Sequence, residues 1–439
     1  MALDNDELNK RRKERELQRK KRQAEQRKLR LRLVFVAVAL IACIVGIVIL
    51  TGGKAGAPGE TTPPETTVPE TTAAPTEAPG RTVQETTKVI HIKAAGDLNI
   101  TDSVVNSADT DLGYDYTRPF MDVAPILADA DLTLLNLEGN ICGAPYGTAS
   151  VSAPEELLDA LVWSGVDMVQ MANSYSVYNG MIGLSQTLDN IRKAGLEPLG
   201  AYSSENEFRK GKGYTIVDIQ GVKIAFVAFT KGMGSLGLPA GSENCVNVLY
   251  TDYSTTYRDV DDEKITSILK KAQSEKPDLT IALLHWGSEY NDALSETQEE
   301  ILNLMKKNGV DAIIGTHPHM VHQMEYENET GFFIAYSLGD FFGNATKGGS
   351  NYSIILDLEI TKDLETGVTK VTDYSYTPIY TLTESETADG HRRVVRIREA
   401  MAAYDVNFVD KVSASAYAGM QNALERIADR VVPKVTEKK

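Results

Sequence analysis

Cysteine is scarce in this chain of 439 residues, which contains only Cys43, Cys142 and Cys245. Three scattered cysteines are too few for a disulfide framework and lack the paired spacing of a thiolate zinc site. Cys43 lies within an apolar run, which leaves at most one disulfide, and we expect none. These counts exclude the disulfide-rich and cysteine-zinc classes of protein.

Positive charge is also scarce outside the amino-terminal segment. The whole chain has a net charge of −16, yet residues 1–32 hold 13 Lys/Arg against 6 Asp/Glu, so residues 33–439 carry about −23. An acidic body has no basic face with which to meet phosphates, so we expect no nucleic-acid partner.

Only one long apolar run is present, the 18 uncharged residues 33–50. At about 1.5 Å per residue this run nearly spans a bilayer core. A cleaved signal peptide is the alternative, but the long basic segment before the run favours an uncleaved anchor. The basic residues at 27–32 predict a single pass through the cell membrane, with the amino terminus inside and the carboxyl-terminal domain extracellular.

Composition divides the chain into a basic cytoplasmic segment, a transmembrane anchor, a Pro/Thr/Glu-rich linker, a main domain and a carboxyl-terminal helical extension (1–32, 33–50, 51–87, 88–385 and 386–439). The linker repeats Glu-Thr-Thr among prolines, so it buries too little apolar area to fold and is expected to be a disordered stalk. The extension has amphipathic stretches at 392–404 and 408–431, which predict helices that pack as a cap.

Apolar strand patterns alternate with helical patterns in the main domain, which predicts an α/β fold with a parallel sheet covered by helices. A hairpin is expected at 214–219 and 222–229 around Gln220-Gly221. Strands at 352–360 and 368–380 are expected to complete a second sheet. The other expected elements are strands at 89–95, 132–139, 167–173, 196–199, 279–284 and 311–314 and helices at 121–130, 154–164, 183–194, 260–274 and 297–308.

Side chains able to bind a metal lie at the ends of five of these strands. A single polar strand end is weak evidence for a metal site, because a Gly-Asp pair after a strand is usually only a turn. His91 lies inside its strand and is expected to be a packing or surface residue. Together the oxygen and imidazole donors predict a site for one or two divalent ions, with manganese, iron or zinc the best candidates. The predicted ligands are Asp97, Asn136, Glu138, Asn173, His285, His317 and His319.

The main domain resembles the CapA family of bacterial capsule and poly-γ-glutamate synthesis proteins, a branch of the calcineurin-like metallophosphoesterases. The resemblance covers residues 88–345. It rests on Gly96-Asp97, Asn136-Leu137-Glu138-Gly139, His285-Trp286-Gly287 with Glu289-Tyr290, the Gly315-x-His-Pro-His319 run with Gln323, and Tyr336-Ser-Leu-Gly339.

The resemblance implies a four-layer α/β/β/α sandwich of the metallo-dependent phosphatase type. Asp97, Glu138, His285, His317 and His319 fall on the family's metal-site positions. Similar proteins are membrane-anchored, face outward and serve in making, exporting or anchoring an anionic polymer. The implied partners are the membrane, capsule-synthesis or export subunits, and the anionic surface polymer itself.

The chain departs from the family pattern near the third predicted strand. Ser174-Tyr175 stands where the family usually has Asn-His, Tyr178 where it has Asp, and Asp340 where Asn is common. A phenol cannot act as an imidazolium, so Tyr175 is expected instead to donate a hydrogen bond to a developing oxyanion.

Two further residues are candidates for moving a proton during catalysis, Glu289 and His322. Each has a simpler alternative. Glu289 would then only hold His285 in place, and His322 would be a surface residue after the turn.

Three interpretations of function stay open. The first is a metal-dependent hydrolase or transferase, phosphoesterase-like, of the surface-polymer machinery or with another substrate. The second is a non-catalytic scaffold subunit of a polymer complex, and the third a purely structural surface module. The predicted metal ligands favour the first two interpretations over the third, and Ser174-Tyr175 favours the second over the first.

Overall fold

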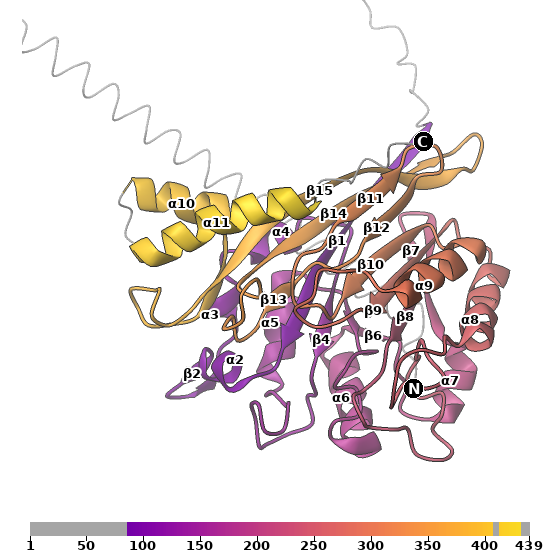
Figure 1. Ribbon diagram of the computed structural model, residues 1–439, viewed down its shortest axis with the longest axis horizontal. Helices are drawn as coiled ribbons and strands as arrows, with labels where there is room; N and C mark the ends of the chain where they lie inside the picture. The colour runs from indigo at the N-terminus through magenta and orange to yellow at the C-terminus, as the bar shows by residue number, and fades with distance from the viewer. Residues whose placement is uncertain (1–85, 407–411, 432–439) are drawn as a thin grey trace, which may run out of the picture. The chain divides into compact units, whose positions relative to one another are not determined.

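The computed structural model describes residues 86–406 and 412–431 (Figure 1). The predicted basic segment and transmembrane anchor, and the linker up to residue 85, lie outside the described residues. Within the described part of the chain, no helix combines the length and the apolar character needed to cross a membrane.

The first of two large sheets has the order β16-β15-β14-β1-β4-β5-β6, with β13 also paired to β1. Strands β1, β4, β5 and β6 are mutually parallel, as the strand–helix alternation predicts. In contrast, β14 pairs antiparallel with β1, β15 with β14, and β16 with β15. The strands are β1 Thr87–Asn99, β4 Leu132–Glu138, β5 Met168–Gln170, β6 Glu197–Leu199, β13 Asp340–Phe342, β14 Tyr352–Asp363, β15 Thr369–Leu382 and β16 Arg393–Arg396.

The second sheet has the order β11-β12-β10-β9-β8-β7. The predicted hairpin is confirmed as β7–β8, and Gln220 and Gly221 both have positive φ (54° and 87°), as a two-residue hairpin turn of type I′ requires. The strands are β7 Tyr214–Ile219, β8 Val222–Thr230, β9 Leu279–His285, β10 Ala312–Thr316, β11 Met324–Glu327 and β12 Phe332–Ala335.

Helices fill most connections between the strands, and their ends carry the expected signals. Ser295 and Gln298 form a capping box at the start of α9, and Gly165 and Gly195 end α5 and α6 in the left-handed conformation. The helices are α2 Asp102–Asn106, α3 Thr117–Phe120, α4 Ala124–Leu127, α5 Glu156–Ser164, α6 Gly180–Ala194, α7 Glu205–Gly211, α8 Asp262–Ser274, α9 Glu296–Lys307, α10 Ile397–Asp405 and α11 Ala414–Val431; β2 Asp109–Thr110 and β3 Gly113–Tyr114 form a small separate ribbon.

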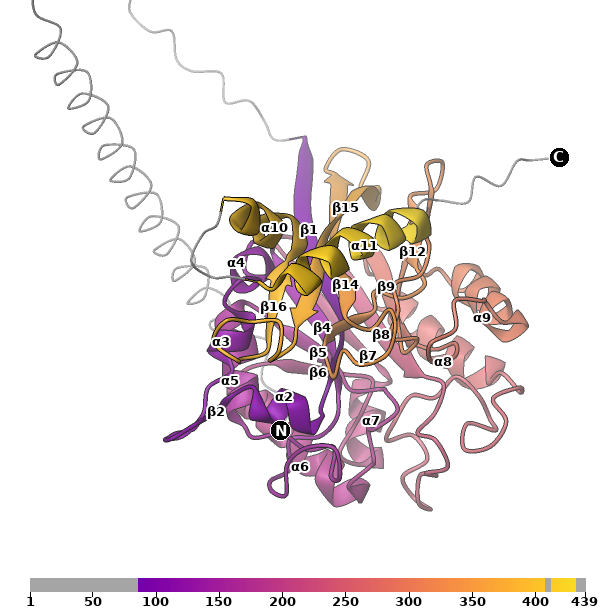
Figure 2. The ribbon, with the colours of Figure 1, turned by 60° about the vertical axis from the view of Figure 1, so that its left-hand side comes forward.

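Side chains of β8 show how the layers pack. Ile224 and Phe226 belong to a core shared with the first sheet, whereas Ala225 and Val227 pack with residues of α8 and α9. Successive strand residues point to opposite faces, so the second sheet lies between the first sheet and these two helices. Helices α10 and α11 pack on β14–β16, as the cap prediction expects (Figures 1 and 2). The predicted mixed α/β fold with two sheets is confirmed.

Several predictions of elements are wrong. The strands expected at 352–360 and 368–380 do not complete the second sheet, because β14 pairs with β1, for example Ile92 with Leu358, and extends the first. Residues 393–396 form edge strand β16 instead of a first helical turn, and 121–130 contains only the short α4. Periodicity indicates which face of a segment is buried, but it does not identify the neighbouring strand.

Candidate metal centre

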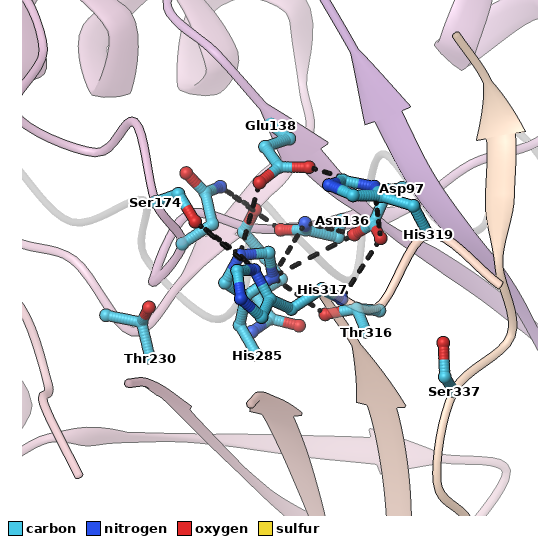
Figure 3. Close-up of polar contacts among 12 residues, drawn as sticks. Asp97, Asn136, Glu138, Ser174, Thr230, His285, Thr316, His317, His319 and Ser337 are labelled. Carbon is cyan, nitrogen blue, oxygen red and sulfur yellow. Dashed lines mark hydrogen bonds and ion pairs between the residues drawn. The ribbon is translucent and has the colours of Figure 1, made fainter. Parts of the chain in front are cut away.

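The carboxyl ends of strands from both sheets meet at one place (Figure 3). Asp97 of β1 pairs with Asn136 of β4, and His285 of β9 pairs with Thr316 of β10. Asp97 does not follow its strand as predicted, because β1 continues to Asn99 past an irregularity between Ala94 and Asp97. Such a bulge redirects a side chain, here toward the second sheet.

The loop after β10 carries the next two predicted ligands in strained backbone. His317 has φ of 96° and His319 has φ of 58°, in the left-handed region that residues other than glycine rarely adopt. Conformations of this kind cluster at functional sites, where the surrounding structure holds them. The backbone N–H of His317 donates to Asp97 Oδ2 at 3.1 Å and ties the loop to β1.

Four side chains form what we call the His317 donor group. His285 Nε2 lies 2.9 Å from Ser174 Oγ, 3.1 Å from His317 Nδ1 and 3.2 Å from Glu138 Oε1, and Ser174 Oγ lies 3.4 Å from His317 Nδ1. Ligands bound to one ion at about 2.0–2.2 Å stand roughly 3–3.5 Å apart. Two imidazole nitrogens and two oxygens therefore have the spacing of a single coordination sphere.

A second set, the His319 donor group, lies next to the first. His319 Nδ1 is 2.8 Å from Asp340 Oδ1, 3.5 Å from Asp97 Oδ2 and 4.0 Å from Glu138 Oε2. Asn99 Nδ2 donates to Asp340 Oδ1 at 2.9 Å. Glu138 belongs to both groups, one carboxylate oxygen in each, so two neighbouring ions could share it.

The predicted ligands Asn136 and Asn173 are brought to the site, but their amides bond to neighbouring residues. Asn173 Nδ2 donates to Asn136 Oδ1 at 3.1 Å and to the Leu137 carbonyl at 2.7 Å. Asn136 Nδ2 in turn donates to Asp97 Oδ1 at 2.6 Å. In this arrangement the two amides orient Asp97.

Burial and mutual charges shift the pKa values of the clustered carboxylates and imidazoles. Burial raises the pKa of Glu138 to about 7, and burial together with the Glu138 charge raises that of Asp97 to about 7. Burial lowers the pKa of His285 to about 3, which keeps its ring neutral and able to bind metal. Burial also opposes the charge on His319, but Asp340, Glu138 and Asp97 outweigh it and raise the pKa to about 11, so this ring would have to lose a proton in order to bind a metal.

One atom tests directly whether the residues fit a metal ion. Glu138 Oε2 is buried and has no hydrogen-bond partner among the described residues. His319 Nδ1, 4.0 Å away, is too distant for a hydrogen bond, so Oε2 lacks the direct partner that a buried carboxylate oxygen needs. The donor groups therefore fit a divalent cation in their spacing and in this buried oxygen without a hydrogen bond.

The candidate proton carriers have different surroundings. Glu289 is exposed, and one of its oxygens and ring nitrogens of His317 and His319 lie within 4.8 Å of one another. The surface alternative for His322 is wrong, because only 4% of the residue is exposed and burial lowers its pKa to about 4. Val321 faces the protein interior beside it, so the turn folds back onto the core.

A cavity of about 570 Å³ adjoins the His317 donor group. Its lining includes Ser174, Tyr175, Tyr178, Lys231, Glu289 and His317. Burial, followed by the charges of Glu138 and Glu289, raises the pKa of Tyr175 to about 12, so its phenol stays protonated at neutral pH. Tyr175 therefore lines the cavity with a protonated phenol, and its role as hydrogen-bond donor stays a prediction.

Three members of the donor groups are not among the ligands predicted from the sequence. Ser174 and Asp340 stand out in the sequence only as departures from the family pattern, and Asn99 gives no signal. The short distance between Ser174 and His285 depends on how the two sheets pack against each other, which the local sequence does not show. Asp340 reaches His319 because β13 pairs with β1 at Asp97.

Solved structures similar to this chain include a phosphatase of Mycoplasma pneumoniae, at 15% identity and a TM-score of 0.39 over 67% of this chain and 94% of that one. The calcineurin-like phosphoesterase YfkN of Bacillus subtilis is 17% identical with a TM-score of 0.38, over 78% of this chain and 99% of that one.

Two curated proteins are also similar. The "Capsule biosynthesis protein CapA" of Bacillus anthracis is 27% identical over 52% of this chain and 54% of its own length. The "PGA biosynthesis protein CapA" of Bacillus subtilis is 30% identical over 40% of this chain and 42% of its own length. The chain thus spans about half the length of the curated relatives that it matches.

Residues 91–345, more than half of the chain, match the family model described as "Bacterial capsule synthesis protein PGA_cap". This range contains both donor groups and the cavity lining. The chain belongs to the bacterial capsule synthesis protein PGA_cap family.

Proposed function

We propose that this chain is a metal-dependent hydrolase or transferase that acts in capsule or poly-γ-glutamate biosynthesis or export. The observation that carries the proposal is the spacing of Ser174, Glu138, His285 and His317, whose donor atoms lie 2.9–3.4 Å apart along the contacts described above. The proposal includes the finer fold assignment, a four-layer sandwich of the metallo-dependent phosphatase type.

The two donor groups would hold one or two divalent ions, with manganese, iron or zinc as candidates. A bound ion supplies Lewis-acid polarisation of the substrate and lowers the pKa of water. Thr316 Oγ1 lies 3.1 Å from His285 Nδ1, which leaves Nε2 directed at the donor group. The protonated Tyr175 phenol donates a hydrogen bond to the oxyanion that forms on the substrate.

The proposed setting is the outer face of the cell membrane. Residues 33–50 would anchor the chain with its amino terminus inside, residues 51–87 would act as a stalk, and the main domain would contact synthesis or export subunits and the anionic polymer. Support comes from the apolar run, the flanking basic residues and the names of the two similar capsule proteins.

A non-catalytic scaffold subunit is the second candidate function. It is favoured by one observation, the presence of Ser174 and Tyr175 where the family usually has Asn-His. A neutral serine is a weak ligand, and a tyrosine cannot supply the positive charge of an imidazolium. In this case the acidic domain would keep its metal for structure alone.

Aryl phosphate turnover separates the two candidates. The full-length chain in detergent, loaded with Mn²⁺ or Zn²⁺, is assayed with 4-nitrophenyl phosphate and bis(4-nitrophenyl) phosphate. We expect metal-dependent release that His317→Ala abolishes and Tyr175→Phe lowers by about 100-fold. His91→Ala is the matched control, since His91 lies at the surface beside Asp357. Bound metal without turnover of any substrate would favour the scaffold.

A further inference from the structure

Lys231 is placed beside the candidate metal centre by the register of two strands. Thr230, the last residue of β8, pairs with His285, and the backbone N–H of Lys231 donates to the His285 carbonyl at 2.8 Å. In the view of Figure 3, Thr230 lies on the Ser174 side of the cluster, away from His319. The next side chain, Lys231, lines the cavity together with Ser174 and His317.

No carboxylate of the described residues pairs directly with Lys231, although Glu289 lines the same cavity and its charge acts to raise the pKa of the lysine. Its Nζ donates to the Gly287 carbonyl at 2.6 Å and lies 4.6 Å from the centre of the Tyr257 ring. The cavity lining contains one lysine and no arginine, and burial lowers the pKa of His317, the other basic residue there, well below its usual value. An ammonium has three N–H donors, so it retains capacity for an acceptor in the cavity.

The surroundings make the charge on Lys231 unfavourable without a ligand. Lys231 is half-buried, and burial lowers its pKa, while the Glu289 charge acts in the opposite direction. A desolvated charge is stabilised by pairing with an ion of opposite sign. The body of the protein is strongly acidic, so Lys231 is a local exception in an otherwise repulsive field for anions.

The rest of the lining is suited to an apolar or ring-shaped group. Tyr178 and Leu236 are exposed at 42% and 38%, and both line the cavity with Tyr257. Aromatic and aliphatic walls with a few placed polar groups are typical of small-molecule sites, and the volume of about 570 Å³ is in their usual range.

We propose that this cavity binds a substrate through a carboxylate or phosphate group held by Lys231, with the body of the substrate against Tyr178, Tyr257 and Leu236. The inference deepens the proposed function and rests on it in one respect, that the bond to be cleaved would lie beside Ser174 and His317. The anion-binding step itself needs only the cavity and Lys231.

Calorimetric titration of the full-length chain tests the proposal with three probes: phenyl phosphate, phenylacetate and the neutral phenylacetamide. We expect at least one anionic probe to bind tenfold or more tightly than phenylacetamide. Lys231→Met should remove that preference, Lys231→Arg should keep most of it, and Lys193→Met, which changes an exposed lysine paired with Glu155, should have no effect. The stronger anion identifies the carboxylate or the phosphate class.

The outcomes separate this proposal from that of a hydrolase. Titrations are repeated after removal of metal with a chelator. An anion preference that depends on Lys231 in metal-free protein supports the cavity assignment even if no hydrolysis is detected. Equal binding of charged and neutral probes overturns it, whatever the hydrolase assay gives. Equal losses for all three probes in Lys231→Met also overturn it, because they show that Lys231 only supports the loop through Gly287.

Discussion

Glu138 is the residue on which both donor groups depend. Its Oε1 lies 3.2 Å from His285 Nε2, and its Oε2 lies 4.0 Å from His319 Nδ1 without a hydrogen-bond partner. The side chain is only 1% exposed and ends β4 inside the protein. A divalent cation held by the donor groups would stabilise a carboxylate buried in this way.

Glu138→Gln keeps the shape of this side chain and removes its charge. We expect metal affinity to fall by more than about 100-fold, because even partners outside the coordination sphere contribute about 10- to 100-fold. Competition with a chromophoric chelator measures the affinity. Glu155→Gln, at an exposed glutamate, serves as the control. Unchanged affinity in Glu138→Gln would remove this residue from the site.

The donors predicted from the sequence share one local signal, a polar side chain where an apolar strand ends. That signal selected Asp97, Glu138, His285, His317 and His319, which the structure brings close together. It was insufficient for Ser174 and Asp340, whose neighbours come from distant strands. Contacts of this kind depend on the pairing of β13 with β1 and on the packing between sheets, which local periodicity does not encode.

At the scale of elements, the junction of β1 with the 337–340 segment is closely packed. A Cβ built on Gly96 would lie 1.7 Å from the Gly339 carbonyl oxygen, and the Asp97 N–H donates to that oxygen at 3.0 Å. No side chain fits at position 96 unless the two strands separate.

Gly96→Ala is therefore expected to be strongly destabilising. Overpacking typically costs about 1–3 kcal/mol, and the loss here should be at or above the upper end, because the clash is with backbone. Urea unfolding measures the change. At Gly348 an added Cβ would meet nothing within 4 Å, so Gly348→Ala should change stability by less than about 0.5 kcal/mol. Similar stability of the two variants would show that β1 and 337–340 are not in close contact.

The start of β10 gives a prediction for pH. Burial raises the pKa of Asp311 to about 6, although a hydrogen bond from the Thr280 N–H (2.8 Å) acts in the opposite direction. Folding raises the pKa of Asp311. Its contribution to stability is therefore fully present below the pKa that it has in the unfolded chain, and this contribution is lost as the pH rises through about 6.

Asp311→Asn should remove that dependence. Relative to wild type, its free energy of unfolding should improve by about 1 kcal/mol between about pH 5 and about pH 8. Urea unfolding at the two pH values gives the difference. If the free energy of unfolding of Asp311→Asn instead fell further below that of wild type as the pH rose, the charged form of Asp311 would be shown to stabilise the fold.

Element prediction succeeded where the sequence carries local signals and failed where partners are distant. The β7–β8 hairpin follows from Gln220-Gly221, and α6 ends at Gly195 as its glycine indicates. The sheet that receives β14 was predicted wrongly, because alternation alone cannot distinguish the two sheets. Edge strand β16 was predicted as helix because Arg393–Arg396 is short and continues directly into α10.

For the whole molecule, metal binding should contribute to stability, because the two donor groups connect strands of both sheets. An ion at about 1,000 times its Kd stabilises the folded state by about 4 kcal/mol. In a chain of this size we expect a chelator to lower the Tm by at least a few degrees. His317→Ala should show little or no shift with chelator. Equal shifts in both proteins would place the metal effect elsewhere.

The most direct measurement is the metal content of the full-length chain after dialysis, determined by plasma mass spectrometry. We expect one or two divalent ions per wild-type chain and less than about a tenth of that amount in a Glu138→Gln, His317→Ala double variant that remains folded. Wild-type protein that holds no ion, or a double variant that holds as much as wild type, would contradict this expectation.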